Sequence, residues 1–241
     1  MADRPATIVT DSLSEQAYRL LRDKIVRGDL RQGQRLDLTA LSQEAGVSRT
    51  PIRGALARLE ADQLVLTRPR SGTFVAVITE RDIDEVCGMR QAIEWFATYE
   101  ATSRMPDEVK EDLRREIEEA DRAMERGDFE PFFHSDMNLH RTIIRYSGNT
   151  RMMAVRDSLE AYLEWLRIAG ASGTHRTGAA AARHHEIVDA MLAGDAERAQ
   201  NLASLHVSEV RAWTLADFRE LGLGAPDGAG PTALPQPAGA G

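Results

Sequence analysis

The segment over residues 41–65, LSQEAGVSRTPIRGALARLEADQLV, constrains the fold most, because it predicts two short helices joined by a sharp turn. The first helix is expected over residues 39–45, and Gly46 follows as the turn residue, where a positive φ costs glycine little. The second helix has one apolar face, whose residues recur at steps of three and four: Ile52, Ala55, Leu56 and Leu59. This layout predicts a helix-turn-helix, whose second helix presents its N-terminal residues to DNA bases.

The start of the second helix carries side chains suited to DNA. Arg49 and Arg53 are four residues apart and project from one side, where each guanidinium can donate two hydrogen bonds to guanine. The hydroxyls of Ser48 and Thr50 suit phosphate oxygens, and Ser48 is also expected to cap the helix by accepting a backbone N–H. The alternative is an ordinary amphipathic helix with a capped start and a solvated basic face.

A β-hairpin is predicted directly after this helix. Two β-rich runs, residues 64–66 and 73–77, flank a basic turn that contains Arg68, Arg70 and Gly72. A hairpin that follows a recognition helix is a wing, and its tip arginines can reach the DNA backbone or the minor groove.

The motif VSRTPIRGAL, a hydrophobic pair and SGTFV about twenty residues later resemble the winged-helix reader of the GntR family of bacterial transcription regulators. The sequence departs from the usual family pattern at Gly54, where Glu is common, and at Gln63, where Gly is common. The resemblance implies DNA contacts from the following residues: Ser48, Arg49, Thr50, Arg53, Arg68, Arg70 and Gly72.

Charge, cysteine content and the lengths of apolar runs limit which kinds of protein this chain can be. The formal net charge is −8, but residues 1–80 hold a slight basic excess, so the acidic excess lies in the rest of the chain. DNA affinity is therefore expected to depend on a local basic patch and on salt. The single cysteine, Cys87, rules out an intramolecular disulfide and agrees with a reducing cytoplasm. No apolar run approaches 18 residues and no signal-peptide pattern is present, so neither a membrane span nor export is expected.

Helical periodicity dominates after Val77. The predicted fold class is mainly α, with an N-terminal winged helix-turn-helix carrying a small β-hairpin wing, and a C-terminal all-α bundle of about six to seven helices. The predicted helices of the bundle span residues 80–103, 107–126, 129–147, 150–169, 178–193 and 196–220. The expected domains are a flexible arm (1–10), the DNA-binding domain (11–78), the helical domain (79–220) and a disordered Gly/Ala/Pro tail (221–241).

A second constellation lies in the helical part. Asp136 and His140 are four apart on one helix face, while His184 and His206 each fall on the apolar stripe of their own helix. Three imidazoles and a carboxylate that point inward suit a divalent metal: Zn²⁺, which we favour, Ni²⁺, Mn²⁺ or Fe²⁺. The alternative is hydrogen-bonded core histidines. His185 competes with His184 because it is one residue away, His134 faces elsewhere, and His175 sits in a Gly/Ser loop.

The segments DMNLHRTIIRYSGN and HHEIVDAMLAGDAERA, followed by His206, are similar to the all-helical FCD ligand-binding domain of the FadR-like GntR branch. The resemblance implies that Asp136, His140, His184 and His206 hold the metal, and that a small carboxylate effector binds near it. Arg90, in MRQAIEWFA, can hold the effector's carboxylate or form a salt bridge to Glu94. Asn149, in SGN, is a weaker effector candidate and a natural helix cap.

The sequence thus predicts a homodimeric, metabolite-responsive transcription regulator, a repressor by preference, that binds an inverted-repeat operator in double-stranded DNA. One alternative is a winged-helix DNA-binding protein whose helical domain only dimerises, with neither metal nor effector. A remote alternative is a metal-dependent hydrolase. Because no spare side chain near the ligands has the spacing of a general base, we do not expect an enzyme.

Overall fold

The computed structural model describes residues 11–169 and 176–220, with the backbone alone for residues 167–169. The chain forms two compact units, the first ending at Val77 and the second beginning at Ile78. The expected arm over residues 1–10, the tail from residue 221 and the loop histidine His175 lie outside the described residues.

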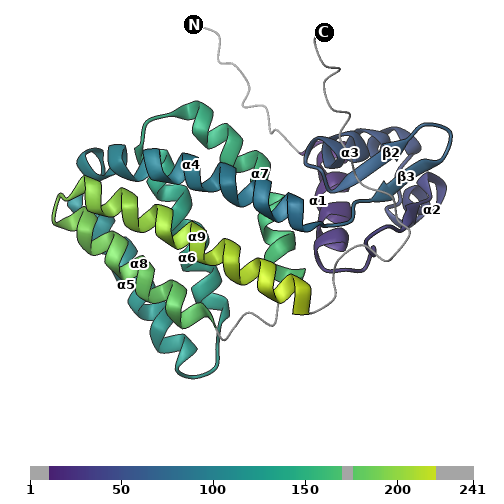
Figure 1. Ribbon diagram of the computed structural model, residues 1–241. Helices are drawn as coiled ribbons and strands as arrows, with labels where there is room; N and C mark the ends of the chain where they lie inside the picture. The colour runs from purple at the N-terminus through teal and green to yellow at the C-terminus, as the bar shows by residue number, and fades with distance from the viewer. Residues whose placement is uncertain (1–10, 170–175, 221–241) are drawn as a thin grey trace, which may run out of the picture. The chain divides into compact units, whose positions relative to one another are not determined.

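Within its described residues, 11–77, the first unit contains three helices and a three-stranded antiparallel sheet (Figure 1). The helices are α1 (Leu13–Val26), α2 (Leu38–Glu44) and α3 (Arg49–Ala61). The strands are β1 (Arg35–Leu36), β2 (Val65–Arg68) and β3 (Gly72–Val75), in the order β1-β3-β2. Helices α1 and α3 pack against each other through fully buried side chains: Leu21, Ile25, Ile52 and Leu59.

Strand β1 lies in residues 30–38, which the sequence predicted to be a connection without regular structure. Arg35 pairs with Phe74 and Leu36 with Thr73, so β3 has a partner on both sides. Gly33, with φ 74°, turns the chain back toward β3, and its N–H donates to Val75 O at 3.1 Å. A two-residue strand carries too few side chains to produce a period-2 pattern, so no sequence signal announced it.

The second unit contains six helices within the described residues, and the expected fold class is confirmed. They are α4 (Glu80–Arg104), α5 (Asp107–Met124), α6 (Glu130–Tyr146), α7 (Thr150–Ala169), α8 (Thr177–Leu192) and α9 (Ala196–Glu220). Helix α4 begins with a capping box, in which the Thr79 hydroxyl accepts the Asp82 N–H and the Asp82 carboxylate accepts the Thr79 N–H. Helices α4 and α9 lie side by side along most of their length (Figure 1).

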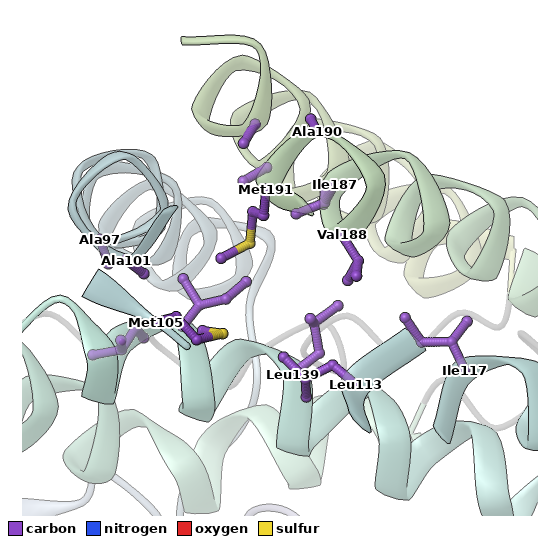
Figure 2. Packing of buried hydrophobic residues seen from close by; sticks show 14 of the residues in the cluster. Ala97, Ala101, Met105, Leu113, Ile117, Leu139, Ile187, Val188, Ala190 and Met191 are labelled. Carbon is purple, nitrogen blue, oxygen red and sulfur yellow. The ribbon is translucent and has the colours of Figure 1, made fainter. Parts of the chain in front are cut away.

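The core of this unit is apolar and draws on most of its helices. Figure 2 shows Leu113 and Ile117 of α5 facing Leu139 of α6, with Ile187 and Met191 of α8 across from them. The small residues Ala97 and Ala101 of α4 are also fully buried in this cluster. This packing brings together α6, α8 and α9, which carry the polar cluster described below, and α4, which contacts it. No described helix is both long and apolar enough to cross a lipid bilayer.

Candidate functional site

The exposed start of α3 is the first candidate surface. Arg49, Thr50 and Arg53 are all exposed there. Ser48 occupies the N-cap position, but the expected hydrogen bond from its side chain to the helix is not formed, which corrects that prediction. The usual donor to such a cap is the N–H of the third helical residue, and here that residue is Pro51, which has none. The Ser48 hydroxyl is therefore not committed to capping.

The hairpin predicted as a wing is present, and its turn is tightly built. Arg70 takes a left-handed conformation with φ 64°, and the guanidinium of Arg68 lies over the Phe74 ring at 5.4 Å. Gly72 has φ 115°, and a Cβ there would lie 3.0 Å from Nε of Arg35. Glycine is thus required at this position. Arg35, which is exposed on β1 beside the turn, is an additional basic side chain that went unnoticed because β1 was not predicted.

The second unit brings Asp136, His140, His184 and His206 together from α6, α8 and α9. One ligand atom from each lies within 4.8 Å of the others. Asp136 Oδ1 is 3.5 Å from His140 Nε2 and 3.4 Å from His184 Nε2, and His184 Nε2 is 3.3 Å from His206 Nε2. The three histidines are at most 1% exposed.

Burial and neighbouring charges set the protonation of this cluster. Burial lowers the pKa of His184 and holds the pKa of His206 well below its ordinary value, so both are neutral imidazoles with a lone pair to offer. For His140 the cost of burial is outweighed by the Glu94 carboxylate, which raises its pKa. Burial also opposes ionisation of Asp136, but the adjacent imidazoles of His140 and His184 hold its pKa well below the usual range.

These residues fit a divalent metal. Ligand atoms about 2.0–2.1 Å from a tetrahedral metal are about 3.3–3.4 Å apart, close to the separations found here. His140 Nε2 is buried and has no hydrogen-bond partner among the described residues. A buried imidazole nitrogen without a partner is costly unless something binds it. The donor set of three imidazoles and one carboxylate suits Zn²⁺ and its first-row neighbours.

Glu94 on α4 supports the cluster from outside. Its carboxylate lies 2.8 Å from His140 Nδ1 and accepts a hydrogen bond from Arg90 Nε at 2.5 Å. Burial of Glu94, at 1% exposure, raises its pKa, but Arg90 and His140 outweigh this and leave the pKa below the ordinary value. The sequence suggested Glu94 only as a partner of Arg90. Its contact with His140 joins two helices and left no sequence signal.

A cavity of about 200 Å³ adjoins the cluster, with Arg90 and Asp136 in its lining. Arg90 forms the salt bridge to Glu94 and keeps a second nitrogen, Nη2, that is buried without a hydrogen-bond partner among the described residues. Asn149 does not line the cavity. Its Oδ1 instead accepts the N–H groups of Arg151 and Met152 at 3.1 Å and caps α7.

The remaining described histidines lie away from the cluster, so His184 and not its neighbour His185 belongs to it. His185 pairs with Asp121 of α5 at 2.7 Å, and exposed His134 lies 3.4 Å from Glu130. Neither contributes to the buried polar cluster.

Comparison with protein families matches both units. Residues 13–75 match the family of bacterial regulatory proteins named gntR, and residues 85–209 match the FCD domain. The chain belongs to the GntR family. Its C-terminal unit is an FCD domain, which places it in the FadR-like branch.

Known GntR and HTH-type regulators resemble this chain over most of their length. The HTH-type transcriptional regulator YdhC of Bacillus subtilis is 26% identical over 79% of this chain and 86% of its own. A protein of Paenarthrobacter nicotinovorans named Probable D-xylose utilization operon transcriptional repressor is 29% identical over 77% of this chain and 81% of its own. The crystal structure of a GntR regulator from Rhodococcus sp. RHA1 superimposes with a TM-score of 0.68 at 25% identity, covering 86% of this chain and 99% of its own.

Membership of the GntR family determines what kind of activity this chain has. This GntR protein is a DNA-binding transcription regulator and not an enzyme, as the sequence predicted. The winged helix-turn-helix of the first unit is the DNA-binding part of the family, and the second unit is the part that carries the buried cluster and the cavity.

Proposed function

We propose that this GntR protein is a homodimeric repressor that binds an inverted-repeat operator and responds to a small carboxylate effector at a metal site. The observation that carries the proposal is the set of buried His140, His184 and His206 with the partly exposed Asp136, whose ligand atoms lie within 4.8 Å of one another. The neutral state of two of the imidazoles supports metal binding, as does His140 Nε2, which has no hydrogen-bond partner in the described part of the chain. Zn²⁺ is the ion we favour.

The effector is proposed to bind in the adjoining cavity. A bound divalent metal supplies Lewis-acid positions that take carboxylate oxygens. Arg90 Nη2, which has no hydrogen-bond partner within residues 11–169 and 176–220, is a second donor for the same carboxylate, and the salt bridge to Glu94 holds the guanidinium in place. To act as an effector, the acid must favour one arrangement of the DNA-binding units, and a coupling of about 1–3 kcal/mol changes operator affinity roughly 5- to 150-fold.

A second copy of the chain is proposed to pack on an exposed face of α4. Met89, Trp95, Phe96 and Tyr99 are between 40% and 50% exposed, and helical spacing gathers them into one stripe. Large apolar side chains gathered on one face indicate an interaction surface. One recognition helix reads only a short half-site, so an inverted repeat requires two readers. Phe96→Glu is expected to produce a monomer in light scattering, whereas Arg81→Glu, on the first turn of α4, is expected to leave the dimer intact.

The alternative keeps the DNA-binding and dimerising roles but gives the helical unit neither metal nor effector. It would interpret the four residues as hydrogen-bonded core groups. The close approach of His184 Nε2 and His206 Nε2 at 3.3 Å is compatible with a hydrogen bond when one of them carries a proton. Metal content separates the two functions.

The decisive experiment measures metal by elemental analysis in protein purified without chelator. We expect about one divalent ion per chain, lost in the double variant His140→Ala/His206→Ala and retained in His185→Ala, whose imidazole lies outside the cluster. The three tryptophans, Trp95, Trp165 and Trp213, all lie in the second unit, so their fluorescence checks that this unit remains folded. Wild-type protein that is metal-free and cannot be loaded with Zn²⁺ would leave only the alternative.

The DNA-binding residues need a separate test. With an operator selected from a random-sequence DNA pool, Arg49→Ala and Arg53→Ala are each expected to cost about 1–3 kcal/mol of specific binding. Arg81→Ala, an exposed arginine of the second unit, is the control. Unchanged fluorescence anisotropy titrations for both α3 variants would remove these arginines as base readers.

A further inference from the structure

The walls of the cavity beside the four-residue cluster are mostly apolar. They include three aromatic side chains, Phe132, Phe133 and Trp213, together with Leu163 and Leu166. A ligand that fills about 200 Å³ against such walls must itself be apolar over much of its surface. A polyhydroxylated acid would lose the hydration of its hydroxyls without finding enough partners.

Each of the three arginines of the lining pairs with a carboxylate, and Asp136 and Glu164 are two further acidic side chains of the lining. Arg90 pairs with Glu94, Arg156 donates through Nη1 to Glu160 at 2.5 Å, and Arg176 pairs with Asp217 at 2.8 Å. The arginines therefore add no net positive charge to the cavity. A divalent metal beside the single Asp136 carboxylate leaves a charge of about +1, which one carboxylate neutralises. A second carboxylate would be buried near Glu160 and Asp217 without a cation to compensate it.

Arg156 on α7 offers a second anchor. Arg156 is only 4% exposed and lines the cavity, and its Nε has no hydrogen-bond acceptor among the described residues. The Glu160 carboxylate already compensates its charge, so what Nε lacks is a neutral acceptor and not an anion. A hydroxyl, ketone or ether oxygen meets that need.

We propose that the effector is a monocarboxylic acid with an apolar body and a neutral oxygen, and that this oxygen accepts a hydrogen bond from Arg156 Nε. This inference rests on the proposed function, because it assumes that the acid's carboxylate binds at the metal and Arg90. It excludes two other kinds of acid that a metal alone would accept, namely dicarboxylic acids and sugar acids.

Two matched series of acids test the inference by isothermal titration calorimetry on the full-length, Zn²⁺-loaded protein. One is phenylacetate, 4-hydroxyphenylacetate and 1,4-phenylenediacetate, and the other is hexanoate, 6-hydroxyhexanoate and adipate. Within a series the body is constant and the far end is a hydrogen, a hydroxyl or a carboxylate. In at least one series we expect the hydroxyl to improve affinity roughly 5- to 10-fold over hydrogen. The second carboxylate should weaken binding by at least a similar factor, and gluconate should bind more weakly than the hydroxyl acid.

The variant Arg156→Met/Glu160→Gln removes the donor and its paired charge together. It is expected to abolish the preference for the hydroxyl, measured as the ratio of the affinities for the hydroxyl acid and the unsubstituted acid. Arg151→Met, an exposed arginine on the same helix, should preserve the preference. Tryptophan fluorescence and zinc content verify that each variant is folded and loaded.

The outcomes separate this inference from the proposed function. Tighter binding of a dicarboxylate or of gluconate overturns the inference and leaves the metal-dependent regulator standing, as does a hydroxyl preference that persists in Arg156→Met/Glu160→Gln. Failure of every acid to bind the zinc-loaded protein overturns both the inference and the effector part of the proposed function.

Discussion

Replacing Glu94 by Gln should destabilise the helical unit far more than the same change at Glu85. Both glutamates lie on α4 and each pairs with an arginine four residues earlier, so the local geometry is matched. The side chains of Arg90 and Glu94 are 8% and 2% exposed, whereas those of Arg81 and Glu85 are 74% and 55% exposed. Burial is thus the main difference between the two pairs.

The magnitude follows from that difference. Glu94→Gln leaves the Arg90 guanidinium buried without its counter-charge, and removing one partner of a buried pair costs about 3–5 kcal/mol. The amide oxygen of glutamine still accepts a hydrogen bond, so we expect about 3 kcal/mol. Glu85→Gln removes an exposed i,i+4 pair that solvent screens, so its effect should be much smaller. At an m-value of about 2 kcal/mol/M, the urea midpoint should fall by about 1.5 M for Glu94→Gln and should hardly change for Glu85→Gln.

Urea unfolding followed by tryptophan fluorescence, with a chelator present, measures this difference in the metal-free helical unit. Equal midpoints for the two variants would show that the buried pair contributes no more than an exposed one, and the reasoning would be refuted. With zinc present, Glu94→Gln should also weaken metal binding about 10- to 100-fold, because Glu94 orients His140.

Two further predictions concern the first unit and use amide hydrogen exchange of α3 as the measurement. Gln63 adopts φ 60° at the C-terminus of α3, where its N–H donates to Glu60 O and the N–H of Leu64 donates to Leu59 O. Because glycine adopts a positive φ without strain, Gln63→Gly should stabilise this end of α3 by about 1 kcal/mol. Decreased protection of the α3 amides from exchange would contradict this prediction. Gly54→Ala should stabilise α3 by about 1 kcal/mol through helix propensity only when it is combined with Ser14→Ala, because a Cβ at Gly54 would lie 3.0 Å from Ser14 Oγ. The full gain in the single variant would contradict this prediction and would show that the Ser14 side chain moves aside at no cost.

The local features of this GntR protein followed from the sequence. The helix-turn-helix and all six helices of the second unit could be predicted, because apolar residues at a period near 3.6 specify an amphipathic helix. Asp136 and His140 had to share a face, since residues four apart on a helix always do. The positions of His184 and His206 on the inward stripes of their helices were also visible, and both are buried.

Only the tertiary structure decided which of these faces meet. The 3.3 Å approach of His184 to His206, the contact of Glu94 with His140 and the pairing of β1 with β3 all join segments that are distant in sequence. Hydrophobic periodicity reports that a face is buried and not what it is buried against, because the apolar driving force has no direction. The lack of an acceptor for Arg156 Nε among the described residues is likewise a property of packing, since only the arrangement of α7 against its neighbours determines which donors are paired.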